Sequence, residues 1–343
     1  MKSNLRTAVC HPERRSRFLR PESKACPERR SQQRSKSNGD LQLFLAVLAA
    51  SLFFAPVASP QETTFKVDVK LVNVFVNVTD ANGAIVGGLK KEDFAISEDG
   101  RPQEIAVFER QSELPLNLVL AIDTSGSVHK DMSEEAGAAR HFAHDLLRPQ
   151  DQMSVFQFAT EVRQLTPFTN NLSQIERGLN QLHADWATAL YDAVVEGSQK
   201  LGARQGRKIL VVVSDGDDTA KDQTYADALE AALRNEVTIY SLIDVPIEAS
   251  AGRDTGGEHA LITLSEQTGG KYFYVGAGGL DKAFAQVSDD LRTQYLLGYY
   301  PKNQLPGRDF HRITVTIPRA AANVYNVRNK VGYYADAQVG SNY

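Results

Sequence analysis

The sequence predicts an α/β fold: a doubly wound, mostly parallel sheet with helices on both faces, flanked by a small β module. Two near-continuous apolar runs, Leu116–Ile122 and Ile209–Val213, are typical of parallel strands covered on both faces. Between and beyond them, strand patterns alternate with helical patterns, which indicates crossover connections. Strand-rich patterns on both sides of this region predict the β module.

Charge separates the beginning of the chain from the rest. The first sixty residues hold 11 Lys and Arg against 4 Asp and Glu. Residues 61–343 therefore hold 27 Lys and Arg against 38 Asp and Glu, which gives them a net charge of −11. A surface that acidic argues against nucleic-acid binding. We interpret residues 1–40 as a basic leader outside the fold. Because Cys10–Ser16 nearly recurs as Cys26–Ser31, a translated repeat upstream of the true start is favoured over a long leader or an interaction tail.

An apolar segment follows the basic leader. Leu41–Val57 is uncharged and precedes two small residues, which is the pattern of a secretory signal peptide. We expect a signal peptide over 41–60 and a protein that is exported, to the periplasm, the cell surface or the medium. This apolar segment is shorter than the roughly 20 apolar residues of a membrane-spanning helix, which favours a cleaved signal peptide. The alternative is an uncleaved signal anchor, which would be the sole expected contact with a membrane. Both cysteines, Cys10 and Cys26, precede the cleavage point, so no disulfide is expected.

Residues 61–112 and 297–336 have the alternating patterns and turn signals of strands. Each flank is too small to bury a core alone, so we expect the two to pair as one β module, with the α/β domain at 113–296 inserted between them. The strands expected in the flanks are Thr63–Thr79, Phe94–Glu98, Gln103–Phe108, Tyr295–Tyr300, His311–Ile317 and Val324–Val327.

Within the α/β region, each apolar strand pattern is followed by a helical one, apart from an expected pair of consecutive strands. Ser133 is expected to cap the first helix, since two glutamates follow it. Besides the two apolar runs, the expected strands are Gln152–Phe158, Val162–Phe168, Val237–Ile243 and Lys271–Val275. The expected helices are Ser133–Leu147, Leu172–His183, Thr188–Leu201, Tyr225–Arg234, Ala260–Thr268 and Leu280–Thr293.

Oxygen-bearing side chains follow both apolar runs. Asp123, Ser125 and Ser127 come after the first, Asp215 after the second, and Thr188 begins a helix between them. In an open α/β sheet, ligands bind at the carboxyl edge where the strand order reverses. Carboxylate and hydroxyl oxygens, with no cysteine or histidine, suit Mg²⁺. Taken alone, Asp-x-Ser-x-Ser is a weak signal, and a polar turn that caps a helix is the alternative.

This set of oxygens resembles the metal-ion-dependent adhesion site of von Willebrand factor type A (VWA) domains, which have a Rossmann-like fold. The resemblance covers roughly residues 115–295. The flanks, including Val86–Phe94 and Gly332–Ala335, are similar to the VWFA-related secreted proteins of acidobacteria. One position departs from the pattern: Ala187, preceded by the bulky Trp186, stands where family members often carry glycine before the threonine.

The resemblance also implies roles for the five residues. Ser125 and Ser127 would coordinate the metal directly, Thr188 would do so when a ligand is engaged, and Asp123 and Asp215 would bind mainly through water. The metal is expected to be Mg²⁺, with Mn²⁺ or Ca²⁺ as alternatives. A protein partner would present an Asp or Glu carboxylate to it.

We therefore expect an exported, metal-dependent, adhesion-type binding protein and no enzyme. No catalytic residue is expected, because processing removes the cysteines and the serines lack a positioned base at the level of sequence. The alternatives are a metal-assisted hydrolase or phosphotransferase that uses the same cation, and an envelope scaffold in which the site is vestigial.

Overall fold

The structure is a computed structural model that describes residues 71–110, 113–126, 132–220, 222–244, 255–276, 279–302, 309–318 and 324–335. All of them belong to one compact unit, Val67–Tyr343. The leader and signal peptide predicted at 1–60 lie outside the described residues. In the part of the chain that is described, no helix has both the length and the apolar content needed to span a bilayer.

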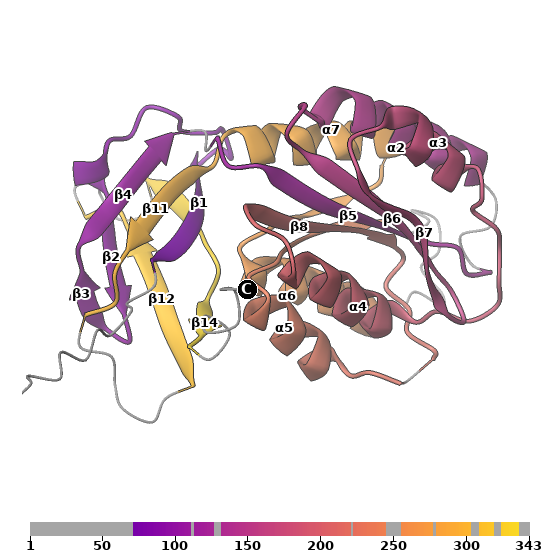
Figure 1. The fold of residues 1–343 in the computed structure, drawn as a ribbon. Coiled ribbons are helices and arrows are strands. Elements are labelled where there is room, and N and C mark those ends of the chain that lie inside the picture. The colour runs from indigo at the N-terminus through magenta and orange to yellow at the C-terminus, as the bar shows by residue number, and fades with distance from the viewer. Residues whose placement is uncertain are drawn as a thin grey trace, which may run out of the picture. The chain divides into compact units, whose positions relative to one another are not determined.

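A six-stranded sheet forms the centre of the α/β region (Figure 1), in the order β10-β9-β8-β5-β6-β7 among the described strands. All neighbouring pairs are parallel except β6 and β7. The predicted mostly parallel sheet is thereby confirmed. Its strands are β5 (Leu116–Asp123), β6 (Gln152–Phe158), β7 (Val162–Thr169), β8 (Arg207–Ser214), β9 (Thr238–Ile243) and β10 (Tyr272–Tyr274).

Helices cover both faces of this sheet (Figure 1). Alternate side chains of β5 enter two separate cores: Leu118 and Leu120 pack in one, Val119 and Ala121 in the other. A strand with two buried faces favours apolar residues on both faces, which explains its near-continuous apolar run. One face carries α2 (Met132–Leu146), α3 (Leu172–Leu179) and α7 (Gly279–Arg292), and the other carries α4 (Leu190–Gly202), α5 (Tyr225–Arg234) and α6 (Thr255–Thr268).

Strands from both flanks pair in two further sheets, which we call the β module. Among the described residues their orders are β13-β1-β11-β4 and β14-β12-β2-β3. Strand β1 lies between β11 and β13, and β2 pairs with β12, so each sheet joins segments from before and after the α/β region. The strands are β1 (Val72–Asp80), β2 (Ala95–Glu98), β3 (Arg101–Gln103), β4 (Ile105–Arg110), β11 (Tyr295–Tyr299), β12 (Phe310–Thr316), β13 (Tyr325–Arg328) and β14 (Gly332–Tyr334), with a short 3-10 helix η1 (Lys91–Asp93) between β1 and β2.

Some expected element boundaries are wrong. Ser133 is the second residue of α2 and not its cap, and α3 ends at Leu179, four residues earlier than expected. Helix α6 begins at Thr255, five residues before the expected start, and includes two glycines. Glycine has a low helix propensity, so the sequence pattern predicted a helix that starts after these glycines. In the structure Gly257 belongs to the helix and packs against the backbone of Gly216, a contact that the local pattern does not indicate.

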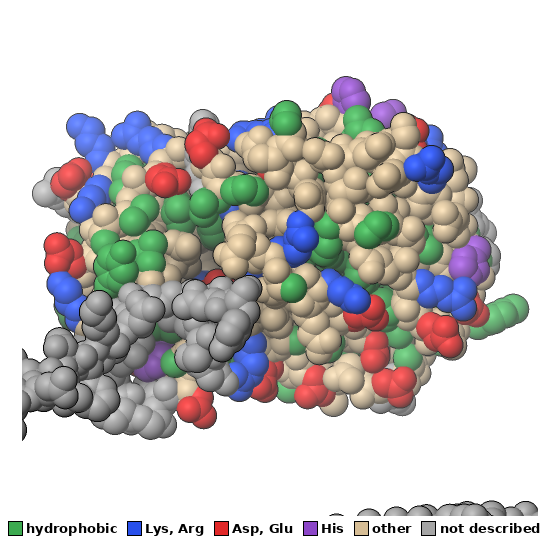
Figure 2. Space-filling model, viewed as in Figure 1, with side chains coloured by type: hydrophobic (Ala, Val, Ile, Leu, Met, Phe, Trp, Pro, Cys, Tyr) green, Lys and Arg blue, Asp and Glu red, His purple; other side chains and the backbone are tan. Residues whose placement is uncertain are grey.

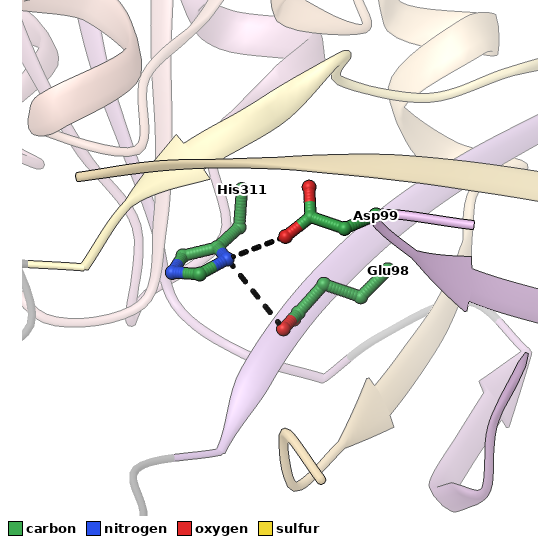
Figure 3. Close-up of side chains that lie close together, drawn as sticks. All are labelled: Glu98, Asp99 and His311. Carbon is green, nitrogen blue, oxygen red and sulfur yellow. Dashed lines mark hydrogen bonds and ion pairs between the residues drawn. The ribbon is translucent and has the colours of Figure 1, made fainter. Parts of the chain in front are cut away.

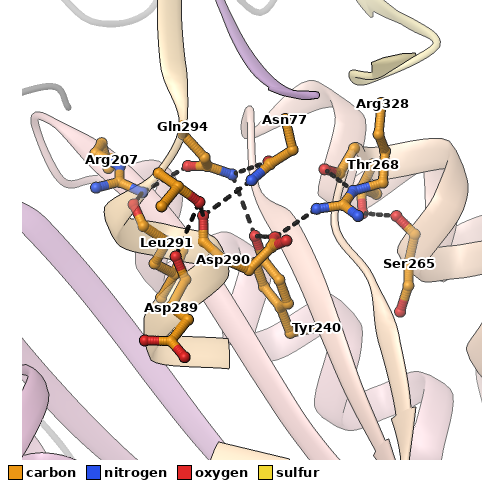
Figure 4. A network of polar contacts seen from close by, with 12 residues as sticks. Asn77, Arg207, Tyr240, Ser265, Thr268, Asp289, Asp290, Leu291, Gln294 and Arg328 are labelled. Carbon is orange, nitrogen blue, oxygen red and sulfur yellow. Dashed lines mark hydrogen bonds and ion pairs between the residues drawn. The ribbon is translucent and has the colours of Figure 1, made fainter. Parts of the chain in front are cut away.

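A buried polar network joins the end of α7 to the β module (Figure 4). The carboxylate of Asp290 accepts hydrogen bonds from the Tyr240 hydroxyl at 2.7 Å and from Arg328. The Asn77 amide donates to the Asp290 carbonyl at 2.9 Å, and the Gln294 amide donates to the Asn77 side-chain oxygen at 2.9 Å. Side chains of β1, β9 and β13 therefore converge on the last turn of α7, just before the chain enters β11.

Candidate metal centre

Two of the predicted metal-binding residues lie at neighbouring strand ends. Asp123 is the last residue of β5, and Ser214, immediately before Asp215, is the last residue of β8; the two strands are adjacent and parallel. The Ser214 hydroxyl donates to Asp123 Oδ2 at 2.6 Å. The chain passes from β5 to β6 on one side and returns to β8 on the other, so this is where the strand order reverses. Ser214 was not predicted as a site residue, although its position before Asp215 at a strand end could have indicated it.

The turn after β5 holds the Asp123 carboxylate in place. The Ser125 backbone N–H donates to Asp123 Oδ1 at 2.9 Å, which is an Asx turn. Both residues are at most 2% exposed. Burial raises the pKa of Asp123 to about 6; hydrogen bonds from Ser214 and Ser125 act in the opposite direction, and the charge of Asp215 adds to the increase. Asp123 is therefore a desolvated carboxyl group that lacks a compensating positive charge from these neighbours.

The loop before α4 places Thr188 against the other two loops. The Thr188 N–H donates to Thr219 Oγ1 at 2.8 Å, and its carbonyl accepts from the N–H groups of Thr219 and Ala220 at 2.9 and 3.0 Å. Further back in the same loop, the Asp185 N–H donates to the Thr124 carbonyl at 3.0 Å. Thr188 is buried and lies two residues before α4. The structure thus ties the loops of Asp123, Thr188 and Asp215 together, while Ser127 lies outside the described residues.

Asp218, on the loop after β8, contacts the first residues of α4. Its Oδ1 accepts hydrogen bonds from the backbone N–H groups of Leu190 and Tyr191, at 2.9 and 3.3 Å, and so caps the start of α4. Burial raises its pKa. The sequence pattern around α4 does not indicate this cap, because capping preferences concern residues next to the helix and Asp218 is 28 residues from Leu190 in the chain.

The residues present fit a divalent cation. Asp123 and Asp215 bring two carboxylates to one edge, where the second raises the pKa of the first, and hydroxyl groups of Ser125 and Thr188 lie on loops tied to that edge. Oxygen-only donors of this kind suit Mg²⁺. A cation would offset the mutual repulsion of the carboxylates and the cost of burying Asp123.

Gly216 allows the loop after β8 to lie against the start of α6. Its φ is +99°, and an added Cβ would lie 2.6 Å from the backbone carbonyl carbon of Gly257. Gly216→Ala is therefore expected to lower the free energy of unfolding by about 2 kcal/mol and to move the adjacent Asp215. Urea denaturation measures the loss. Gly137→Ala, in α2 with nothing within 4 Å of the added Cβ, is the matched control and should be neutral or stabilising. Equal stabilities of the two variants would contradict the prediction.

Comparison with known proteins agrees with this fold. The family model for the von Willebrand factor type A domain matches residues 118–217. No curated protein matches the chain. Among solved structures, the chain is similar to the conserved hypothetical protein BatB from Bacteroides thetaiotaomicron, at 17% identity and a TM-score of 0.42 over 51% of this chain and 97% of that one.

Two other solved structures are similar to this chain. A von Willebrand factor type A protein from Catenulispora acidiphila has 12% identity and a TM-score of 0.45, over 81% of this chain and 78% of that one. The vWF domain of the type V pili tip protein Mfa5 from Porphyromonas gingivalis has 11% identity and a TM-score of 0.41, over 51% and 94%. The similarity of the flanks to acidobacterial secreted proteins stays a prediction. The match at 118–217 runs from strand β5 to the loop after β8, so this part of the chain is similar to the von Willebrand factor type A domain.

Proposed function

We propose that this is an exported protein whose VWA domain binds a divalent cation and, through it, an acidic group on a partner protein. The observation that supports the proposal is the buried carboxylate of Asp123, held by Ser214 and Ser125 beside Asp215 where the strand order reverses. The cation is Mg²⁺, with Mn²⁺ or Ca²⁺ as alternatives. Its ligands would be the predicted set of Asp123, Ser125, Ser127, Thr188 and Asp215.

The chemistry of capture is electrostatic. A bound cation supplies positive charge and a coordination position that the protein does not fill, which an Asp or Glu side chain of the partner can take. Asp123 and Asp215 keep negative charge near the cation, and the burial of Asp123 strengthens that attraction relative to bulk water. No covalent bond is made or broken, and none of the five residues needs to act as a base or a nucleophile.

The surroundings of the site fit a protein partner. Trp186, two residues before Thr188, is 91% exposed, and large aromatic side chains are frequent energetic centres of protein interfaces. Among the described residues visible in Figure 2, acidic and basic side chains are interspersed. Such a face differs from the basic stripe expected of a nucleic-acid-binding protein.

Titration with Mg²⁺ tests the metal site. The chain contains one Trp, so the fluorescence of Trp186 reports on the loop that carries Thr188. Millimolar Mg²⁺ is expected to change that fluorescence and to raise the melting temperature, because a ligand at about 100 times its dissociation constant stabilises the folded state by about 2.7 kcal/mol. Ser125→Ala should weaken Mg²⁺ binding at least about tenfold, since it removes a predicted ligand.

Asp217→Asn is the matched control. Asp217 is a carboxylate on the same loop as Asp215, and it does not belong to the predicted ligand set. It should bind Mg²⁺ like the wild type. The metal site is disproved if the wild type does not respond to millimolar Mg²⁺, or if Ser125→Ala responds as strongly as Asp217→Asn. The scaffold alternative predicts that result.

Affinity capture from the native envelope tests the second half of the proposal. The wild type and Asp217→Asn are expected to retain the same partner in Mg²⁺ and to release it in chelator, and Ser125→Ala should not retain it. A partner held equally well in chelator would contradict cation-mediated capture. Metal-dependent cleavage or phosphoryl transfer on the captured partner would instead favour the enzyme alternative.

A further inference from the structure

A second group of metal-ligating side chains lies in the β module. Glu98, Asp99 and His311 each offer one ligand atom, and these atoms lie within 4.8 Å of one another (Figure 3). The Nδ1 atom of His311 is 2.8 Å from Asp99 Oδ2 and 3.8 Å from Glu98 Oε1. We propose that these three residues form a binding site for a divalent cation that accepts nitrogen as well as oxygen ligands, such as Zn²⁺.

Strand pairing brings the three residues together. Glu98 is the last residue of β2, and Asp99 is the first residue of the two-residue turn to β3. Asp99 has a φ of +50°, which Asp tolerates better than most side chains. Strand β12, which contains His311, pairs with β2, and Arg312 exchanges hydrogen bonds with Asp99. The site therefore joins two segments that are 212 residues apart in the chain.

All three side chains are buried: those of Glu98 and His311 are 2% exposed and that of Asp99 is 4% exposed. Two carboxylates in such a place are costly unless they are hydrogen-bonded and balanced by positive charge. A protonated His311 would supply one positive charge. A divalent cation bound to neutral His311 would supply two, which matches the charge of two ionised carboxylates.

Hydrogen bonds from the surroundings orient each carboxylate. Oε2 of Glu98 accepts from the hydroxyl groups of Tyr299 and Tyr333, at 2.7 and 2.9 Å. Burial raises the pKa of Tyr299, so its hydroxyl keeps its proton and acts as a donor. Oδ1 of Asp99 accepts from the Arg312 N–H at 3.0 Å. Each carboxylate thus has one oxygen held by a fixed donor and the other directed toward His311 Nδ1, as in metal sites with ligands positioned by outer hydrogen bonds.

The ligand set selects the kind of metal. One imidazole nitrogen and two carboxylate oxygens are ligands that Zn²⁺ accepts, whereas Mg²⁺ prefers oxygen ligands alone. His311 Nδ1 and Asp99 Oδ2 lie 2.8 Å apart, close enough for a hydrogen bond. Binding of the cation would use the lone pair of Nδ1, and a proton held there would pass to solvent. This set differs in chemistry from the oxygen-only set near Asp123, so the two sites can be tested separately.

Calorimetric titration with Zn²⁺ tests the proposal, using the purified protein in buffer with excess Mg²⁺. The wild type is expected to bind one Zn²⁺ tightly. Asp99→Asn and Glu98→Gln keep the size of each side chain and should each weaken binding by about 10- to 100-fold or more, as losses of metal-site interactions do. Glu104→Gln, at an exposed carboxylate of the same module, and Ser125→Ala, in the other site, should bind Zn²⁺ like the wild type. Equal Zn²⁺ binding by all four variants, or no tight binding by the wild type, would show that the cluster is a proton-holding network only.

A measurement on the wild type keeps the test independent of variant folding. Nuclear magnetic resonance of the histidine ring nitrogens, with the His311 signals identified by their absence in His311→Gln, should show that Zn²⁺ removes the Nδ1 proton and shifts the Nδ1 resonance. Tyr333→Phe, which removes one donor to Glu98, should weaken this Zn²⁺ effect by about 10-fold or more. Persistence of the His311 Nδ1–H at saturating Zn²⁺ would overturn the proposal.

Discussion

In chelator, the free energy of unfolding is expected to fall by about 3 kcal/mol as the pH rises from about 4 to about 7 because of Asp123 alone. Burial raises the pKa of this carboxyl group from 3.8 to about 6 in the folded protein. The folded state therefore binds the Asp123 proton more tightly than the unfolded state does. The resulting stability is fully present below pH about 4 and is lost as the pH rises through about 6.

Asp123→Asn isolates this contribution, because Asn has the same shape and no charge. The Asn side-chain oxygen can still accept from the Ser125 N–H, and the Ser214 hydroxyl can rotate to accept from the Asn amide. We expect the difference between wild type and variant, measured by urea denaturation at a series of pH values, to change between pH about 4 and about 6 and to level off above that interval. Other carboxyl groups titrate in both proteins and cancel in the difference. Parallel stability curves would show that Asp123 is not desolvated as the structure indicates.

The same experiment connects to the proposed metal site. At pH 7, saturating Mg²⁺ is expected to restore about 3 kcal/mol to the wild type, since the cation would offset the charge of the ionised carboxylate. Asp123→Asn should gain much less. Stabilisation by Mg²⁺ that is equal in the two proteins would place the cation elsewhere.

Asp290→Ala is expected to lower the free energy of unfolding by about 3 kcal/mol or more, as removal of one partner from a buried charged network does. The substitution leaves the Tyr240 hydroxyl, which is fully buried, and the Arg328 guanidinium without their carboxylate acceptor. Burial raises the pKa of Tyr240, so ionisation cannot relieve the loss. Because Arg328 belongs to β13 and Tyr240 to β9, the damage falls at the junction of the β module and the α/β region (Figure 4).

Asp289→Ala is the control for this prediction. Asp289 is the adjacent residue of α7 but is exposed, so its loss should change stability by no more than about 0.5 kcal/mol. Denaturation of both variants at the same pH measures the difference. If Asp290→Ala costs no more than Asp289→Ala, the network does not stabilise the junction.

Much of the fold could be predicted because buried strands have a recognisable local pattern of apolar residues. The near-continuous apolar run of β5 predicted a strand with two covered faces, and both faces are indeed covered. Boundaries were less predictable where contacts from distant residues decided them. Ser133 has the chemistry of a cap but lies inside α2, whereas α4 is capped by Asp218, a residue that follows it in the chain.

The chemistry of the candidate metal centre also had a sequence signal. The residue types and their positions after two apolar runs predicted that Asp123 and Asp215 would reach one edge, and the structure places them at neighbouring strand ends. The assignment of a metal to them stays a prediction. The cluster of Glu98, Asp99 and His311 had no such signal, because the pairing of β2 with β12 depends on the whole β module.

By itself, the sequence determined the class of fold, the order of strands and helices in the α/β region, and the oxygen-bearing residues at the ends of β5 and β8. These features depend on burial periodicity and on residue types within a few positions of each other. Only the tertiary structure decided that Asp123 is buried, that Asp290 connects α7 to the flanking strands, and that His311 lies next to two carboxylates. Each of these depends on contacts between residues far apart in the chain, whose pairing is set by the packing of complete sheets and not by local pattern.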